Sequence, residues 1–163
     1  MGVAGCGKSS LGLALADRLG VPLIEGDDHH SEASRDKMRH GIALTDADRA
    51  GWLDRLGLEL QQHQARDGVA VLSCSALKRA YRDRLRAALP GLGFVYLALE
   101  RDEALRRVAA RPGHFFSATL VDNQYATLEP PQAEADVLEL PATLTIEQLC
   151  LAARQWQQTG AAA

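Results

Sequence analysis

Near the start of the chain, residues 2–9 read Gly2-Val3-Ala4-Gly5-Cys6-Gly7-Lys8-Ser9, which has the G-x-x-x-x-G-K-S spacing of a P-loop. Glycine carries no Cβ, so a glycine-rich turn lets successive backbone N–H groups surround a phosphate chain. In such a loop the Lys8 ammonium would reach the β- and γ-phosphates, and the Ser9 hydroxyl would bind Mg²⁺. The stretch therefore predicts a site for a nucleoside triphosphate and Mg²⁺. The predicted nucleotide site extends to Ser10.

The residues that follow the loop predict a helix with a broad apolar face that ends at Gly20. Its N-terminal N–H groups would face the same phosphates. A strand normally precedes a P-loop, yet only Met1 stands before Gly2. We therefore expect a truncated chain without its first, central strand, and ~5–12 further, mostly β-branched residues in the native protein. We also expect a gap between the strands at 69–72 and 94–99.

Length and composition indicate one globular domain. The chain has 163 residues, of which 47% are hydrophobic and 24% charged, as in proteins with a buried core. A net charge of −3 does not suggest a nucleic-acid partner, and no apolar run approaches the ~18 residues of a membrane span. Cys6, Cys74 and Cys150 are far apart in sequence, which favours reduced thiols in a cytoplasm over disulfides or a zinc site.

Apolar runs alternate with helical patterns along the chain, which is typical of an α/β fold with a mainly parallel sheet. Strands are expected at residues 21–24, 69–72, 94–99 and, more weakly, 136–140. Helices are expected at residues 11–19, 31–39, 46–67, 75–89, 102–110, 117–128 and 145–159. We predict the three-layer P-loop NTPase fold as a single domain over residues 1–163, with a lid segment near 107–130.

Two acids follow the first predicted strand, at the carboxyl edge where open α/β sheets bind ligands. Glu25 and Asp27 are two residues apart and would share one side of an extended strand end. Beside a P-loop, such a carboxylate can hold Mg²⁺ through water and take a proton from an attacking hydroxyl. The second acid common in this class is not visible, because the strand at 69–72 continues into Ser73-Cys74-Ser75. This favours Asp27 as metal ligand and base, although solvated surface charges are the alternative.

Candidate groups for an acidic substrate come from two other places. Lys78 and Arg82 are four residues apart on one predicted helix face and could bind a carboxylate, although an exposed, salt-bridged face explains them equally well. The adjacent His29 and His30 would point to opposite sides of a strand, which disfavours a shared zinc ion. His30 is then better explained as a hydrogen-bonding group for the substrate.

A basic segment surrounds Pro112-Gly113, where a predicted helix ends. Arg107, Arg111 and His114 could belong to a lid that closes over ATP and places a cation on the departing charge. The alternative is a solvent-facing helix end, where cations are favoured by the helix dipole.

Three longer strings follow the P-loop in order. They are Gly26-Asp27-x-x-His30 with Lys37-Met38-x-x-Gly41-x-x-Leu44-x-Asp46-x-Asp48-Arg49-x-x-Trp52-Leu53, then Cys74-Ser75-Ala76-Leu77-Lys78-x-x-Tyr81-Arg82-Asp83, then Gly113-His114-Phe115-Phe116 with Gln124-x-x-Thr127-Leu128-Glu129. From Gly2 to about Pro131 the sequence thus resembles the gluconate kinase family, P-loop kinases of small molecules related to shikimate kinase.

The resemblance implies a gluconokinase, an enzyme that phosphorylates D-gluconate at its 6-hydroxyl with MgATP. It also implies a cytoplasmic protein that can form homodimers. Carried over by position, residues 2–9 would bind the ATP phosphates, and Asp27 would contact the sugar acid and accept its proton. The resemblance further assigns four residues to the substrate pocket, His30, Lys78, Arg82 and His114. It assigns Arg107 and Arg111 to the lid, and it gives Lys8 and Arg111 a catalytic role.

Several residues near the presumed sugar site depart from the family pattern. The family usually has Asn at Ser34, Pro at Gly51 and often Asp at Glu25, and apolar residues are common at Asp28-His29. Two alternatives therefore stay open. One is a kinase for another small polyol acid such as shikimate, and the other is a nucleotide-binding protein without catalysis.

Overall fold

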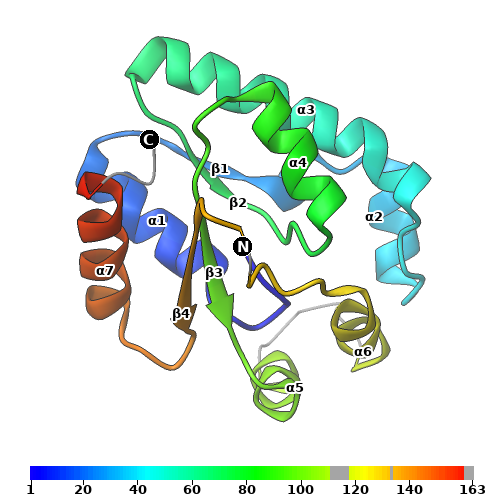
Figure 1. Cartoon of the computed structure of the whole chain (residues 1–163). Helices are drawn as coiled ribbons and strands as arrows, with labels where there is room; N and C mark the ends of the chain where they lie inside the picture. Colours follow the sequence, from blue (N-terminus) through cyan, green and yellow to red (C-terminus); the bar gives the residue numbers. More distant parts are fainter. Residues whose placement is uncertain (111–117, 133, 160–163) are drawn as a thin grey trace.

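The computed structural model describes residues 1–110, 118–132 and 134–159 (Figure 1). The strands are β1 (Leu23–Glu25), β2 (Val71–Ser73), β3 (Phe94–Ala98) and β4 (Val137–Pro141). The helices are α1 (Lys8–Leu19), the 3₁₀ turn η1 (Gly26–His29), α2 (Glu32–Arg39), α3 (Asp46–Asp67), α4 (Arg79–Ala88), α5 (Arg101–Ala109), α6 (Ala118–Thr127) and α7 (Ile146–Gln158). The predicted α/β alternation is confirmed. Within these ranges no helix combines the length and apolar character that crossing a membrane requires.

The strands form two parallel pairs rather than one continuous sheet. β1 pairs with β2, and β3 pairs with β4, each in parallel register. β2 and β3 are not hydrogen-bonded to each other, so the gap that the sequence predicts between them is confirmed. Met1 lies in this gap, because its carbonyl accepts from Leu97 N at 3.0 Å.

Helix ends follow local sequence signals. Gly20 caps α1 in the left-handed conformation, with φ of 71°. Thr45 and Asp48 form a capping box that starts α3, so Asp46 is the first helical residue and not the cap. The predicted helix start at Ser75 is wrong, because Ala76 has φ of 44° and the chain enters α4 only at Arg79.

Two apolar clusters lie on opposite sides of the strands. Figure 1 shows α1 and α7 on one side and α3 and α4 on the other. The first cluster joins α1, α5, α6 and α7 to β3 and β4, and it includes the loop residues Val3 and Cys6. The second packs α3 and α4 against the strands around Leu56 and Leu85, which are fully buried. Helices on both sides of parallel strands give the predicted three-layer arrangement.

Candidate active site

Two side chains of the P-loop point into the core, whereas Ser9 at its end is exposed. Val3 and Cys6 are buried in the core, so their side chains turn inward. Gly7 caps α1 in the left-handed conformation, with φ of 93°, which a side chain would disfavour. A Cβ on Gly5, with φ of 81°, would lie 3.2 Å from the Ala104 carbonyl oxygen. The loop therefore leads into the N-terminus of α1, where backbone N–H groups can bind an anion.

A cavity of about 1230 Å³ lies over this loop. Ala4, Gly5, Gly7, Lys8, Ser9 and Ser10 line one part of it. Another part is lined by η1, α2, the start of α3 and the loops between them, through Asp27, Asp28, His30, Glu32, Arg35, Met38, Arg39, Ala43, Leu44 and Arg49. α5 and α6 contribute Arg106, Arg107, Leu120, Asn123 and Gln124. The volume has room for two small ligands side by side.

Lys8 and Ser9 lie at the nucleotide end of the cavity, where the sequence places them. Lys8 Nζ donates to the carbonyl oxygen of Val3 at 2.9 Å. The Ser9 hydroxyl lies 3.4 Å from that of Ser73, the last residue of β2. Ser73 is buried and occupies the strand end where, as the sequence indicated, the second acid common in this class is absent.

Asp27 and His30 lie together at the other end. The 3₁₀ turn that follows β1 separates Glu25 from Asp27, so the prediction that both share one side of an extended strand is wrong. The side chain of Asp27 is 82% exposed, and Oδ1 lies 4.0 Å from His30 Nε2. His30 is itself buried and stacks on Trp52 at 4.4 Å between ring centroids. Burial lowers the pKa of His30 to about 4, so its imidazole is neutral near pH 7.

Two buried side-chain nitrogens lack a hydrogen-bond partner in the part of the chain that the structure describes. They are His30 Nδ1 and Arg49 Nε, and both residues line the cavity. Buried polar atoms are rarely left unpaired in folded proteins, so this pair points to a polar ligand. Arg35 and Arg39 of α2 line the same part and add positive charge.

Arg49 is a candidate binding residue that sequence reasoning missed. Its guanidinium carbon lies 5.8 Å from the centroid of the Tyr81 ring, within the range of a cation–π contact. Asp48-Arg49 stands in the family string, but nothing local distinguishes Arg49 from the other arginines of the chain. Only the tertiary packing of α3 shows that Arg49 lines the cavity.

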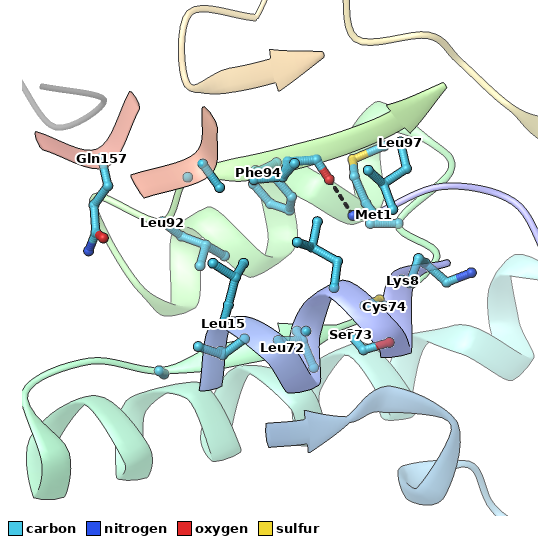
Figure 2. Close-up of a pocket in the computed structure, with 18 of the residues that line it drawn as sticks. Met1, Lys8, Leu15, Leu72, Ser73, Cys74, Leu92, Phe94, Leu97 and Gln157 are labelled. Atoms are coloured by element: carbon cyan, nitrogen blue, oxygen red, sulfur yellow. Dashed lines mark hydrogen bonds between the residues drawn. The ribbon is translucent and has the colours of Figure 1, made fainter. Parts of the chain in front are cut away.

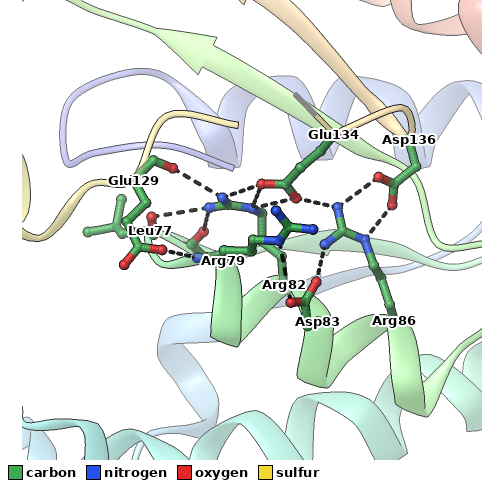
Figure 3. Close-up of polar contacts among 9 residues, drawn as sticks. Leu77, Arg79, Arg82, Asp83, Arg86, Glu129, Glu134 and Asp136 are labelled. Atoms are coloured by element: carbon green, nitrogen blue, oxygen red, sulfur yellow. Dashed lines mark hydrogen bonds and ion pairs between the residues drawn. The ribbon is translucent and has the colours of Figure 1, made fainter. Parts of the chain in front are cut away.

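The structure pairs Lys78 and Arg82, the two predicted substrate-binding cations, with other groups of the protein. Neither lines the cavity among the described residues. Lys78 Nζ instead donates to both carboxylate oxygens of Asp46, at 2.7 and 2.8 Å. Arg82 is 1% exposed and donates to Glu134 and to the carbonyl oxygens of Ala76, Leu77 and Glu129 (Figure 3). With its nitrogens engaged in this way, the guanidinium holds the fold together and has no free edge for a substrate.

α5 and α6 cover the P-loop. Arg107 lines the cavity and donates to the carbonyl oxygens of Ala142 at 3.1 Å and Gly5 at 3.4 Å. Gln124 accepts from the Ala4 backbone N–H at 2.6 Å, a contact that sequence reasoning did not foresee. The predicted roles of Arg111 and His114 lie outside the described residues.

The oxygen donors near the P-loop suit Mg²⁺. The Ser9 hydroxyl and the Asp27 carboxylate both line the cavity, and Mg²⁺ prefers one or two such oxygens together with water and phosphate. Among the described residues no group of three or more His, Cys, Asp or Glu side chains could hold a metal ion by itself. A metal at this place would therefore depend on the bound nucleotide for further ligands.

Comparison with known proteins agrees with this geometry. Residues 4–139 match the shikimate kinase family. A probable gluconokinase of Schizosaccharomyces pombe is 43% identical over 149 residues, which cover 86% of this chain and 76% of the relative. The gluconokinase of Gluconobacter oxydans is 42% identical over 140 residues, which cover 86% of this chain and 79% of the relative. The crystal structure of a gluconokinase from Sinorhizobium meliloti 1021 has a TM-score of 0.81 and 39% identity, and the match covers 97% of this chain and 94% of that one.

The P-loop, the two-ended cavity and the shikimate kinase match define the protein as a P-loop kinase that acts on a small molecule. Because the sequence identity to these gluconokinases is high and the matches cover most of each chain, the chain belongs to the gluconokinase family.

Proposed function

We propose that the protein transfers the γ-phosphoryl group of ATP to the 6-hydroxyl of D-gluconate. The observation that carries the proposal is the cavity with two chemically different ends. One end offers P-loop backbone N–H groups and Lys8, and the other offers the unpaired nitrogens of His30 and Arg49. A triphosphate fits the first end, and an acidic polyol fits the second.

At the nucleotide end, the residues of the P-loop would surround the β- and γ-phosphates. Lys8 would leave the Val3 carbonyl and place its ammonium on the β/γ-phosphates. Ser9 and Asp27 would hold Mg²⁺, which neutralises charge on the phosphate oxygens when it is bound. Arg107 and Gln124 touch the same loop, which supports our further proposal that the segment near 107–130 acts as a lid within a single domain.

At the acceptor end, Asp27 would act as the general base. Its exposed carboxylate would accept the proton of the 6-hydroxyl as that oxygen bonds to the γ-phosphorus and the bond to the ADP oxygen breaks. The neutral His30 would hydrogen-bond the hydroxyl groups of the substrate. Arg49 would bind the substrate carboxylate, in place of the Lys78 and Arg82 suggested by sequence position.

A coupled assay of ADP release tests the proposal, with ATP, Mg²⁺ and a panel of gluconate, other aldonates and shikimate. Turnover with gluconate at the highest kcat/KM is the expected result. A higher kcat/KM for another acid would reassign the acceptor, and ATP binding without turnover on any acid would refute catalysis. The cytoplasmic location and the homodimer that the family resemblance implies are proposals too, and gel filtration with light scattering tests the second.

A further inference from the structure

Trp52 contacts two of the groups that the proposed function uses, although it does not reach the cavity itself. It is 3% exposed and lies on α3, three residues after Arg49. Among the described residues, the lining of the cavity includes Arg49 but not Trp52. Residues three apart share one side of a helix, so α3 turns both side chains toward the region of η1.

The indole N–H of Trp52 anchors the turn that carries Asp27. Its Nε1 donates to the carbonyl oxygen of Gly26, the first residue of η1, at 2.7 Å. A Cβ on Gly26 would lie 2.6 Å from the Ser73 carbonyl oxygen, so the turn packs against the end of β2, where Figure 2 shows Ser73. Among the described residues, no side chain donates a hydrogen bond to the Asp27 carboxylate, and His30 Nε2 lies 4.0 Å away. The backbone of η1 therefore sets the direction of Asp27.

The ring of Trp52 holds the plane of the His30 imidazole. The two rings stack at 4.4 Å between their centroids, with an angle of 11° between their planes. His30 is 4% exposed, and its Nδ1 lacks a hydrogen-bond partner in the part of the chain that the structure describes. The outer torsion of a histidine side chain has a broad energy well, so hydrogen bonds or packing must fix the ring. The stack on Trp52 is thus the contact that orients the unpaired nitrogen for a ligand.

We propose that Trp52 is a positioning residue for the acceptor end of the cavity, an inference that rests on the proposed function. Its N–H holds η1 and through it the base Asp27, while its ring face holds His30 for the substrate hydroxyl groups. A displaced base slows the chemical step, whereas a misdirected hydrogen-bonding group weakens substrate binding. Loss of the N–H should therefore lower kcat, and loss of the stack should raise KM for the acceptor.

Two substitutions separate these contacts, because they involve different parts of one side chain. Trp52→Phe keeps an aromatic face against His30 but removes the N–H donor, and Trp52→Leu removes both. Leu60→Ala is the matched control, because Leu60 is fully buried on the same helix and is absent from the described lining of the cavity. Steady-state kinetics and Tm are measured with the acid that gives the unmodified chain its highest kcat/KM. Calorimetry gives the dissociation constants of that acid and of gluconate.

Trp52→Phe is expected to lower kcat about tenfold while KM for the acid stays within about twofold of its original value. Trp52→Leu is expected to lower kcat by a similar factor and to raise both KM and the dissociation constant of the acid about tenfold. Leu60→Ala should lower Tm and leave kcat and KM of the folded protein within about twofold. An unchanged kcat in Trp52→Phe, or a Trp52→Leu variant that loses only Tm as the control does, would overturn the proposal.

Failure of the proposed function would give a different result. If the unmodified chain transfers phosphate to none of the acids, catalysis is refuted, and the dissociation constant of gluconate still tests the stack. That constant should rise in Trp52→Leu and stay unchanged in Leu60→Ala, and equal values in the two variants would overturn the role of Trp52 as well. A chain that phosphorylates gluconate without the expected split between kcat and KM would overturn the role of Trp52 alone.

Discussion

Asp27 occupies the first turn beyond β1, with a side chain that is 82% exposed and directed to the cavity. If it is the general base, Asp27→Asn keeps the shape but cannot take a proton. We expect kcat to fall by ~10²–10⁴ while KM for ATP stays within a few-fold. Steady-state kinetics with both substrates varied measure this.

The neighbouring Asp28 is a matched comparison, because it lines the same cavity on the same 3₁₀ turn. Asp28→Asn should change kcat much less than Asp27→Asn. A rise in acceptor KM with unchanged kcat in the Asp27 variant would make Asp27 a binding residue and not the base.

Arg49 combines a buried, unpaired Nε with a place in the cavity lining. Loss of a charge-assisted bond to a carboxylate costs about 1.5–3 kcal/mol, so Arg49→Ala should raise gluconate KM roughly ten- to a hundredfold. Arg49→Lys should recover only part of this, because lysine lacks the planar fork. An unchanged KM for gluconate, with a raised KM for ATP, would place Arg49 at the wrong end of the cavity.

The start of α4 and the segment after α6 are joined by one buried ion-pair network (Figure 3). Glu134 is 6% exposed and accepts from both Arg82 and Arg86. Glu134→Ala would leave the Arg82 charge buried without its partner, at a cost of about 3–5 kcal/mol in the free energy of unfolding. Urea unfolding measures the loss, and KM for gluconate in the folded fraction should stay near that of the unmodified chain.

An exposed pair between α3 and α4 provides the control. Arg84 and Asp54 lie 2.6 Å apart, but their side chains are 45% and 56% exposed. Asp54→Ala should therefore cost at most about 1 kcal/mol. Equal losses in the two variants would mean that burial does not set the strength of the Glu134 network.

His30 and Glu134 should each make the free energy of unfolding fall as the solution is acidified. Burial lowers the pKa of His30 from 6.5 to about 4, so between these values the unfolded chain binds a proton that the folded chain does not. Bonds from Arg82 lower the pKa of Glu134 from 4.5 to about 2, with the same sign at lower pH. The free energy of unfolding should thus decrease from about pH 6.5 down to pH 2.

Urea unfolding across this pH range, repeated for His30→Gln, separates the two groups. The variant should lose the slope between pH 4 and 6.5 and keep the slope below pH 4.5. Parallel curves for both chains in the upper window would show that His30 does not have the lowered pKa assigned to it.

The sequence by itself determined what depends on near neighbours along the chain. The P-loop spacing, the glycine cap at Gly20 and the position of Asp27 after a strand could all be predicted. Each involves residues within a few positions of one another, so local backbone preference and hydrogen bonding suffice.

Only the tertiary structure decided which of the two arginines Arg49 and Arg82 lines the cavity. Arg49 and Arg82 both stand early in a helix, yet the first lines the cavity and the second is buried against Glu134, 52 positions away in sequence. Helix periodicity assigns a residue to a face but does not say what packs on that face. Ala76 has a left-handed backbone that delays the start of α4, and the Ala76 and Leu77 carbonyl oxygens accept from Arg82. No local sequence signal marks this turn.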